Sequence, residues 1–331
     1  MRAPPPEAAI DCRNMHERKE VGTMRRLALI FAGGAVWLLL FALPVFADNG
    51  PHMQGAGATA DTCAGCHRAH TAKAAKLLVD AQPALCYTCH GSTSTGAATD
   101  VQSGIAYTLT AGARTTTVAG ALRGGGFVNA RIDTANPNVG TGTVLVLTAG
   151  AAVTSTHSVD GSNATAWGNG TSGAGATIQL RCGSCHDPHG NQAYRILRPV
   201  PDQSGAGTGV TIADATTKSY TTTNYWSPAD ANQALFLTNV SNWCSTCHTR
   251  YLSTAATNSG DAIYTYRHKS DGTTANSPNC VQCHVAHGSN AAMGTYSQAV
   301  KNPDGSAASP VTDSRLLRID NRGVCQMCHN K

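Results

Sequence analysis

Hydrophobic residues are concentrated in one stretch of this chain. An apolar run covers 27–43, behind the basic triplet Met24-Arg25-Arg26 and ahead of the small-residue site Val45-Phe46-Ala47. This order of basic, apolar and cleavable segments is typical of a secretory signal peptide. We therefore predict a signal peptide over 24–47, export by the Sec pathway and no membrane span after cleavage. With 17 residues the run is at the lower limit for a membrane-spanning helix, so an uncleaved anchor is the alternative.

The first 23 residues are polar and irregular, and they precede the methionine that opens the signal peptide. We interpret 1–23 as upstream residues of a mis-annotated start, and 48–331 as the mature protein. On this interpretation Cys12 and His16 are not part of the mature chain. The 13 cysteines are thereby reduced to an even twelve.

Long periodic segments are missing after the signal peptide. The stretches 91–180, 201–234 and 291–313 are rich in Gly, Ala, Ser and Thr, and only 105–110 and 143–148 resemble short strands. Aromatic residues make up 5% of the chain and charged residues 13%, below the usual share of charge. We predict a mostly irregular fold with short helices at the cysteine motifs and a few short strands. Because such a chain cannot build a large aliphatic core, another group must fill its interior.

All twelve remaining cysteines fall into one repeated pattern, C-x-x-C-H, which occurs six times. The cysteines are Cys63 and Cys66, Cys86 and Cys89, Cys182 and Cys185, Cys244 and Cys247, Cys280 and Cys283, and Cys325 and Cys328. This pattern attaches c-type haem: two thiols form thioethers with the vinyl groups, and the histidine binds the iron as proximal ligand. The proximal histidines are His67, His90, His186, His248, His284 and His329. A zinc or thiol-redox site has no reason to require histidine at that position, so we predict six haem c groups.

Six further histidines are available for the opposite face of six irons. They are His52, His70, His157, His189, His268 and His287. Methionine is the other common ligand, but the mature chain has only Met53, Met293 and Met327. We therefore predict bis-histidine ligation at every haem, which favours low potentials. A solvent-exposed histidine is the alternative for any of the six, above all for His157 and His268.

The first, third and fifth motifs continue as His-x-x-His, ending at His70, His189 and His287. Three residues span at most ~10 Å, too little to pass around the same porphyrin. Each of these histidines must therefore bind another haem, and we expect the next one in sequence. This pairing predicts three di-haem units over 63–90, 182–248 and 280–329. An apolar pair before each even-numbered motif supports it: Leu77-Leu78, Leu235-Phe236 and Leu316-Leu317.

His52 lies near the start of the mature chain, on an arm rich in Gly and Ala. Such an arm could reach the first haem of its own chain or a haem of a neighbouring molecule. A ligand supplied in trans makes a head-to-tail contact, and contacts of this kind that do not close build filaments. The net charge of +5 is too small to indicate a nucleic-acid partner.

The doubled C-x-x-C-H motifs, the His189-Gly190 and His287-Gly288 extensions and the segment 89–93 resemble the secreted multihaem cytochromes of metal-reducing bacteria. Among them the pattern is most similar to the OmcS-type hexahaem cytochromes, which polymerise into extracellular filaments. The resemblance implies bis-histidine haems in alternating parallel and T-shaped pairs, and one histidine that crosses between subunits. His52 best fits that crossing ligand.

The resemblance favours an extracellular electron conduit that passes electrons to other cytochromes or external acceptors. A monomeric periplasmic shuttle is the alternative, because periplasmic cytochromes share these motifs. An enzyme such as a multihaem reductase needs an iron with an open position, and six spare histidines fill all six. We therefore expect no catalytic residues.

Overall fold

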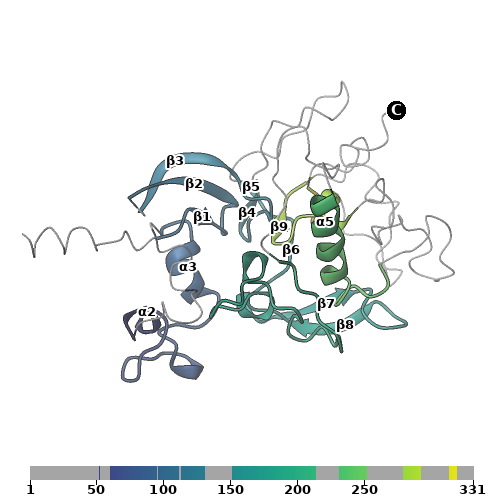
Figure 1. Cartoon of the computed structure of the whole chain (residues 1–331), viewed down its shortest axis with the longest axis horizontal. Coiled ribbons are helices and arrows are strands. Elements are labelled where there is room, and N and C mark those ends of the chain that lie inside the picture. Colours follow the sequence, from purple (N-terminus) through teal and green to yellow (C-terminus); the bar gives the residue numbers. More distant parts are fainter. Residues whose placement is uncertain are drawn as a thin grey trace, which may run out of the picture. The chain divides into compact units, whose positions relative to one another are not determined.

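We describe a computed structural model of the chain, which covers residue 52 and the ranges 60–94, 96–111, 113–130, 151–213, 231–251, 279–291 and 313–318 (Figure 1). These residues belong to one compact unit, Pro51–Lys331. The predicted strand at 143–148, His268, the sixth motif and the signal peptide lie outside the described ranges.

The described part of the chain is mostly irregular, as the sequence predicts. Its helices are α2 (Ala60–Ala64), α3 (Ala84–His90), α4 (Cys182–Cys185), α5 (Ala231–Cys244) and α6 (Cys280–Cys283), with 3-10 turns η1 (Ala75–Leu77) and η2 (Tyr194–Ile196). All five helices contain or end at cysteines of the motifs. The prediction of short helices there is confirmed. The 14-residue α5 begins inside 201–234, a segment that we had expected to be only connective.

Four small antiparallel sheets complete the described fold. The largest has the order β1-β2-β3, formed by Thr99–Asp100, Ile105–Thr110 and Ala113–Ala121. Strand β2 has the bounds that the sequence predicts, and it pairs with β3 from Ile105 opposite Ala121 to Thr110 opposite Ala113, with register shifts near Tyr107. In Figure 1 the two strands form a curved ribbon.

The other sheets have two strands each and join distant parts of the chain. They are β4 (Asn129–Ala130) with β5 (Ala151–Ala152), β6 (Ser155–Thr156) with β9 (Gly288–Ser289), and β7 (Asn163–Trp167) with β8 (Gly175–Gln179). The β6–β9 pair matters most for the site, because it places the segment around His157 beside the fifth motif.

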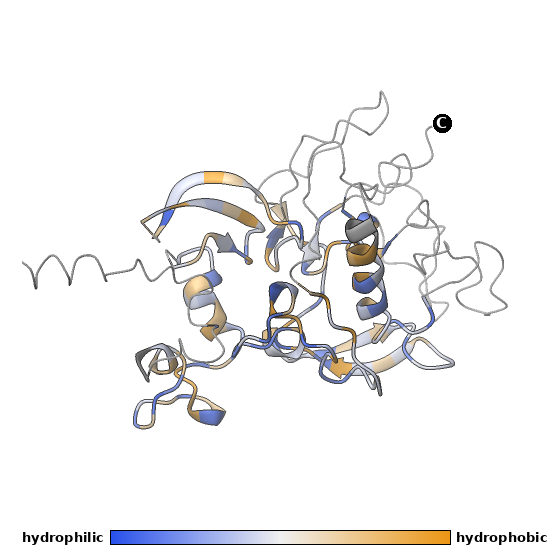
Figure 2. Cartoon of the chain, in the orientation of Figure 1, coloured by the Kyte–Doolittle hydropathy of each residue, from blue (hydrophilic) through white to orange (hydrophobic). Residues whose placement is uncertain are grey.

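The apolar core consists of small separate clusters. One surrounds α5 and contains Ile212, Phe236, Leu237 and Val240, all less than a tenth exposed. Another joins Ala166 of β7 to Ile178 and Leu180. Figure 2 shows the most hydrophobic residues in short stretches of the ribbon. Within the described ranges these clusters are small, which agrees with the expectation that a bound group fills the interior.

The helices of the described ranges include none that is both long and apolar enough to cross a membrane.

Candidate functional site

The first, third and fifth motifs share one backbone arrangement. The proximal histidine of each forms a β-bridge with a later leucine: His67 with Leu78, His186 with Leu197 and His284 with Leu317. The residue after the leucine donates its N–H to the carbonyl of the second cysteine: Val79 to Cys66 (2.9 Å), Arg198 to Cys185 (2.8 Å) and Arg318 to Cys283 (2.8 Å). The structural repeat therefore extends well beyond the five residues of the motif.

Two consecutive left-handed residues precede each of these leucines. Their φ values are 61° and 60° at Lys76 and Leu77, 52° and 51° at Arg195 and Ile196, and 48° and 57° at Arg315 and Leu316. A left-handed residue other than glycine costs about 1–2 kcal/mol, and strain of this kind is retained where the surroundings require it. Here it turns the carbonyl of the basic residue toward the motif.

That carbonyl accepts a hydrogen bond from Nδ1 of the proximal histidine. The distances are 2.9 Å from His67 to Lys76, 2.8 Å from His186 to Arg195 and 3.0 Å from His284 to Arg315. Because Nδ1 carries the hydrogen, the lone pair of Nε2 is free. Histidines that bind metals are oriented in this way, since the outer hydrogen bond sets both the tautomer and the ring direction.

The left-handed turns also correct the apolar repeat found in the sequence. Leu77 and Leu316 are equivalent, as expected, but their counterpart in the second unit is Ile196, whereas Leu235 and Phe236 lie in α5. The sequence does contain a pattern that identifies Ile196 as this counterpart. A basic residue is followed by two aliphatic residues in Lys76-Leu-Leu, Arg195-Ile-Leu and Arg315-Leu-Leu. Apolar spacing alone missed it because the basic residue acts through its backbone carbonyl.

The even-numbered motifs that the structure describes follow longer helices. His90 is the last residue of α3, and its Nδ1 is hydrogen-bonded to the Thr99 hydroxyl (2.7 Å) at the start of β1. His248 comes four residues after α5, and its Nδ1 donates to the carbonyl of Trp167 (2.6 Å) in β7. Nε2 of His248 is again left free, because a carbonyl can only accept a hydrogen bond.

Three of the expected distal histidines have the same kind of hydrogen bond. Nδ1 of His52 donates to Pro188 (2.7 Å), Nδ1 of His157 to Ala286 (2.7 Å) and Nδ1 of His287 to Gly125 (3.3 Å), each at a backbone carbonyl. Pro188 and Ala286 occupy the same position, directly before the second histidine of a His-x-x-His extension. His52 and His157 are therefore held in equivalent ways by the third and fifth motifs.

Three pairs of histidines face each other at one common separation. The ring centroids are 6.2 Å apart for His52 and His90, 6.1 Å for His67 and His189, and 6.1 Å for His157 and His248. A transition metal binds an imidazole nitrogen at ~2 Å and the ring centre lies about 1 Å farther, so one ion between two rings requires ~6 Å. Each pair contains one proximal and one expected distal histidine. The spacing fits a single iron held by both.

Burial favours the neutral, metal-binding form of six histidines of the motifs and of the expected distal set. Desolvation lowers the pKa of His90, His157, His186 and His284 below the usual value, and that of His248 to about 4. Burial, and then the nearby His186, lower the pKa of His287 to about 3. The ring of His287 stacks on Phe127 with centroids 4.5 Å apart.

These placements correct the pairing that the sequence analysis expected. His189 lies opposite His67 of the first motif instead of His248 of the fourth, and His248 faces His157. His90 of the second motif faces His52 instead of His70.

His52 was expected to reach the first haem or to cross to a neighbour, and the structure places it within its own chain, opposite His90. His70 is exposed, and none of the described residues hydrogen-bonds to its ring or stacks on it. Among those residues no ring lies opposite His186 or His284 either.

The cysteines of neighbouring motifs also meet. The Cys86 thiol is hydrogen-bonded to the Cys182 thiol, which raises the pKa of Cys86, and the Cys244 and Cys280 thiols form an equivalent pair. All ten described cysteines of the motifs are free thiols. In the described ranges, no three or more His, Cys, Asp or Glu side chains gather as a protein-only metal site would require.

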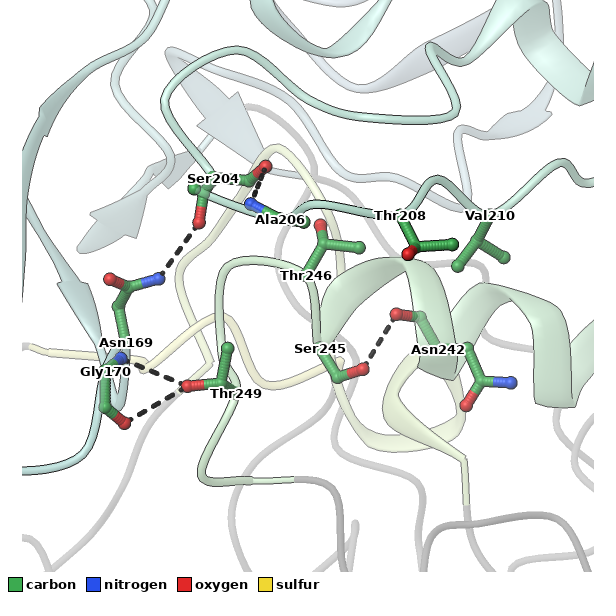
Figure 3. Close-up of a pocket in the computed structure, with 11 residues that line it drawn as sticks. Asn169, Gly170, Ser204, Ala206, Thr208, Val210, Asn242, Ser245, Thr246 and Thr249 are labelled. Atoms are coloured by element: carbon green, nitrogen blue, oxygen red, sulfur yellow. Dashed lines mark hydrogen bonds between the residues drawn. The ribbon is translucent and has the colours of Figure 1, made fainter.

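A polar pocket lies beside the fourth motif (Figure 3). The Asn169 side-chain amide donates to the Ser204 carbonyl (3.3 Å), and the Thr249 hydroxyl bonds to Gly170. Its lining consists of small and uncharged residues and includes no histidine or cysteine. It therefore offers no metal ligand and is separate from the histidine pairs.

Comparison with family models gives one match, the doubled CXXCH motif, over residues 56–95. The matched segment contains the first two motifs with both of their proximal histidines. It supports a multihaem electron-transfer cytochrome. The motifs indicate covalently bound haem c, whose iron supplies a one-electron redox couple. Comparison of the chain with curated proteins and with solved structures gives no match.

Proposed function

We propose that the chain carries six bis-histidine haems c and assembles head to tail into an extracellular filament, of the kind formed by OmcS-type cytochromes, for long-range electron transfer to external acceptors. The observation that carries this proposal is the one-unit offset of the histidine ligands. That offset leaves His70 and His284 without an opposite ring in the part of the chain that the structure describes.

Two rules assign the second histidine ligand of each haem. An even-numbered haem takes its second histidine from the segment before its own unit: His52 for haem II, and His157 for haem IV. An odd-numbered haem takes it from the extension of the next odd motif: His189 for haem I, and His287 for haem III. The first rule extends to His268 for haem VI, which brings all but one of the irons to bis-histidine ligation.

The exception is haem V, whose proximal ligand is His284. No ring of the described residues lies opposite His284, and His70 of the first motif is exposed with no ring opposite it. A second copy resolves both, because His70 of one molecule fills haem V of the next. The crossing ligand that we propose is therefore His70 in place of His52.

The exposure of the first motif supports the same contact. Ser184 of the third motif and Gln282 of the fifth are 5% and 9% exposed. Ala64 and Gly65 at the corresponding place in the first motif are exposed. If a second copy covers α2 as the internal units cover α4 and α6, the contact repeats one operation without closing, which generates a filament.

The remaining assignments follow from this architecture. Filled axial positions leave no iron open to a substrate, so we propose a conduit without enzymatic activity. Export through the predicted signal peptide would deliver it to the cell surface, where other cytochromes or external acceptors are its partners. A monomeric periplasmic shuttle is the second candidate, since the internal haem pairs require no polymer.

Cryo-electron microscopy of the haem protein sheared from the cell surface tests this proposal, with His70→Ala as the variant and His189→Ala as the matched control. Both remove one distal histidine. We expect filaments from the wild type and His189→Ala, and only single particles from His70→Ala. Discrete wild-type particles confined to the periplasm would establish the shuttle, and filaments of His70→Ala would overturn the crossing ligand.

A further inference from the structure

Two junctions in the chain have the same construction. At each, the segment that leads to the first cysteine of an even-numbered motif is hydrogen-bonded to the start of the next odd-numbered motif, which brings together the segments of Cys86 and Cys182 and those of Cys244 and Cys280. Both cysteines of a pair carry a thioether to a haem in the proposed holoprotein. What holds them together therefore sets how closely successive haems approach.

The first junction is held by hydrogen bonds of Gln82. The Oε1 atom of Gln82 accepts a hydrogen bond from the backbone N–H of Gly183 (2.7 Å), inside the third motif. The Gln82 carbonyl accepts a second bond, from Nη1 of Arg181 (2.9 Å). A side chain at Gly183 would come within 3.1 Å of the Gln82 amide, so glycine permits this close approach.

The second junction is held by hydrogen bonds of Ser241. The Ser241 hydroxyl accepts a hydrogen bond from the backbone N–H of Cys280 (3.2 Å) and donates one to Oδ1 of Asn279 (2.9 Å). Ser241 is fully buried in α5, so these bonds are shielded from water. The contact joins α5 to the first residue of α6.

The two contacts follow from one physical need. The first N–H groups of a helix have no partner inside it, and α4 and α6 are only four residues long. At each helix, a side chain that comes shortly before the preceding even-numbered motif accepts one of these N–H groups. Gln82 lies four residues before Cys86, and Ser241 lies three before Cys244. Ser241 and Cys244 both belong to α5 and lie on the same side of that helix, whereas Gln82 lies in the turn just before α3.

We propose that Gln82 and Ser241 are positioning residues that set the separation and relative orientation of haems II and III and of haems IV and V. They act through the backbone of the odd-numbered motif and touch no haem. This inference rests on the proposed haems of motifs two to five, and it is independent of polymerisation.

The test uses the holoprotein with the variants Gln82→Ala and Ser241→Ala. Gln82→Glu keeps an acceptor oxygen and serves as the rescue. Gln203→Ala is the matched control, because Gln203 Oε1 also accepts a backbone N–H, from Gln179 (3.0 Å), away from both junctions. The measurements are haem content by mass spectrometry, the low-spin signal of bis-histidine haem, and the Soret exciton couplet in circular dichroism.

We expect both alanine variants to retain their haems and low-spin signals and to lose couplet amplitude, while Gln82→Glu and Gln203→Ala keep the wild-type couplet. An unchanged couplet in Gln82→Ala overturns the inference, and so does an equal loss in Gln203→Ala, which would indicate general loosening. Wild-type protein with fewer than six haems or without bis-histidine signals would instead contradict the proposed function. The two failures are therefore distinguishable.

Discussion

The imidazole of His189 lies opposite that of His67, with ring centroids 6.1 Å apart and planes within 12° of parallel. The two residues come from different units, since His67 belongs to the first motif and His189 to the extension of the third. One iron between them would join these units across more than a hundred residues of sequence. A haem held by both residues would act as a cross-link between these units.

This relationship predicts which haem changes its spin state when His189 is removed. In His189→Ala one ferric haem should change from low spin to high spin, because its iron loses an axial ligand. Electron paramagnetic resonance measures that change. Adding Cys63→Ala and Cys66→Ala removes haem I, and the high-spin signal should then disappear. If it persists in the triple variant, His189 serves another haem.

The left-handed pair before each bridging leucine predicts opposite outcomes for two substitutions of Lys76, whose φ is 61°. Lys76→Gly should leave the haem I spectrum unchanged and stabilise the protein by about 1 kcal/mol, since glycine adopts this conformation without strain. Lys76→Pro fixes φ near −65° and should displace the carbonyl that orients His67. Denaturant unfolding and the low-spin signal measure both, and equal effects of the two would contradict this view of the turn.

Arg114 holds the loop that follows the second motif. Its guanidinium donates to the carbonyls of Ala97 (2.5 Å), Gly91 (2.8 Å) and Thr99 (2.9 Å), and Thr99 in turn orients His90. Arg114→Lys keeps the charge but not the planar set of donors. We expect a loss of about 1–3 kcal/mol in the free energy of unfolding.

The matched control for this prediction is Arg68→Lys, because Arg68 makes a single exposed bond to Ala64 (3.2 Å). Denaturant unfolding of the two variants gives the comparison. An Arg114→Lys variant as stable as Arg68→Lys would show that the three bonds contribute little.

Neighbouring residues of α5 provide a test of the core. Phe236 is 1% exposed and its ring meets Tyr194 edge to face at 4.9 Å, whereas Leu235 is 49% exposed. Phe236→Ala should cost about 3–5 kcal/mol, since it removes a buried aromatic side chain and leaves a cavity. Leu235→Ala should change stability by less than about 0.5 kcal/mol. Similar losses of stability in thermal unfolding for the two variants would contradict the burial of Phe236 and the exposure of Leu235 in α5.

Covalent chemistry and short-range backbone preferences can be inferred from sequence alone in this chain. The C-x-x-C-H spacing identifies attachment sites because two thiols and the following imidazole are adjacent along the backbone. The strand at Ile105–Thr110 and the short helices at the motifs follow from the same local information. The argument that His70, His189 and His287 serve haems other than their own needs only the reach of three residues.

Which histidines share an iron was decided by the tertiary structure. His52 reaches His90, and His157 reaches His248, because carbonyls at Pro188 and Ala286 orient them, and these carbonyls come from motifs far along the chain. Spacing along the sequence carries no information on such contacts. The extension of the third motif faces the first motif, so its expected pairing with the next haem was wrong. The candidate histidine ligands could be identified from the sequence, whereas the histidine that each of them faces depended on the folded backbone.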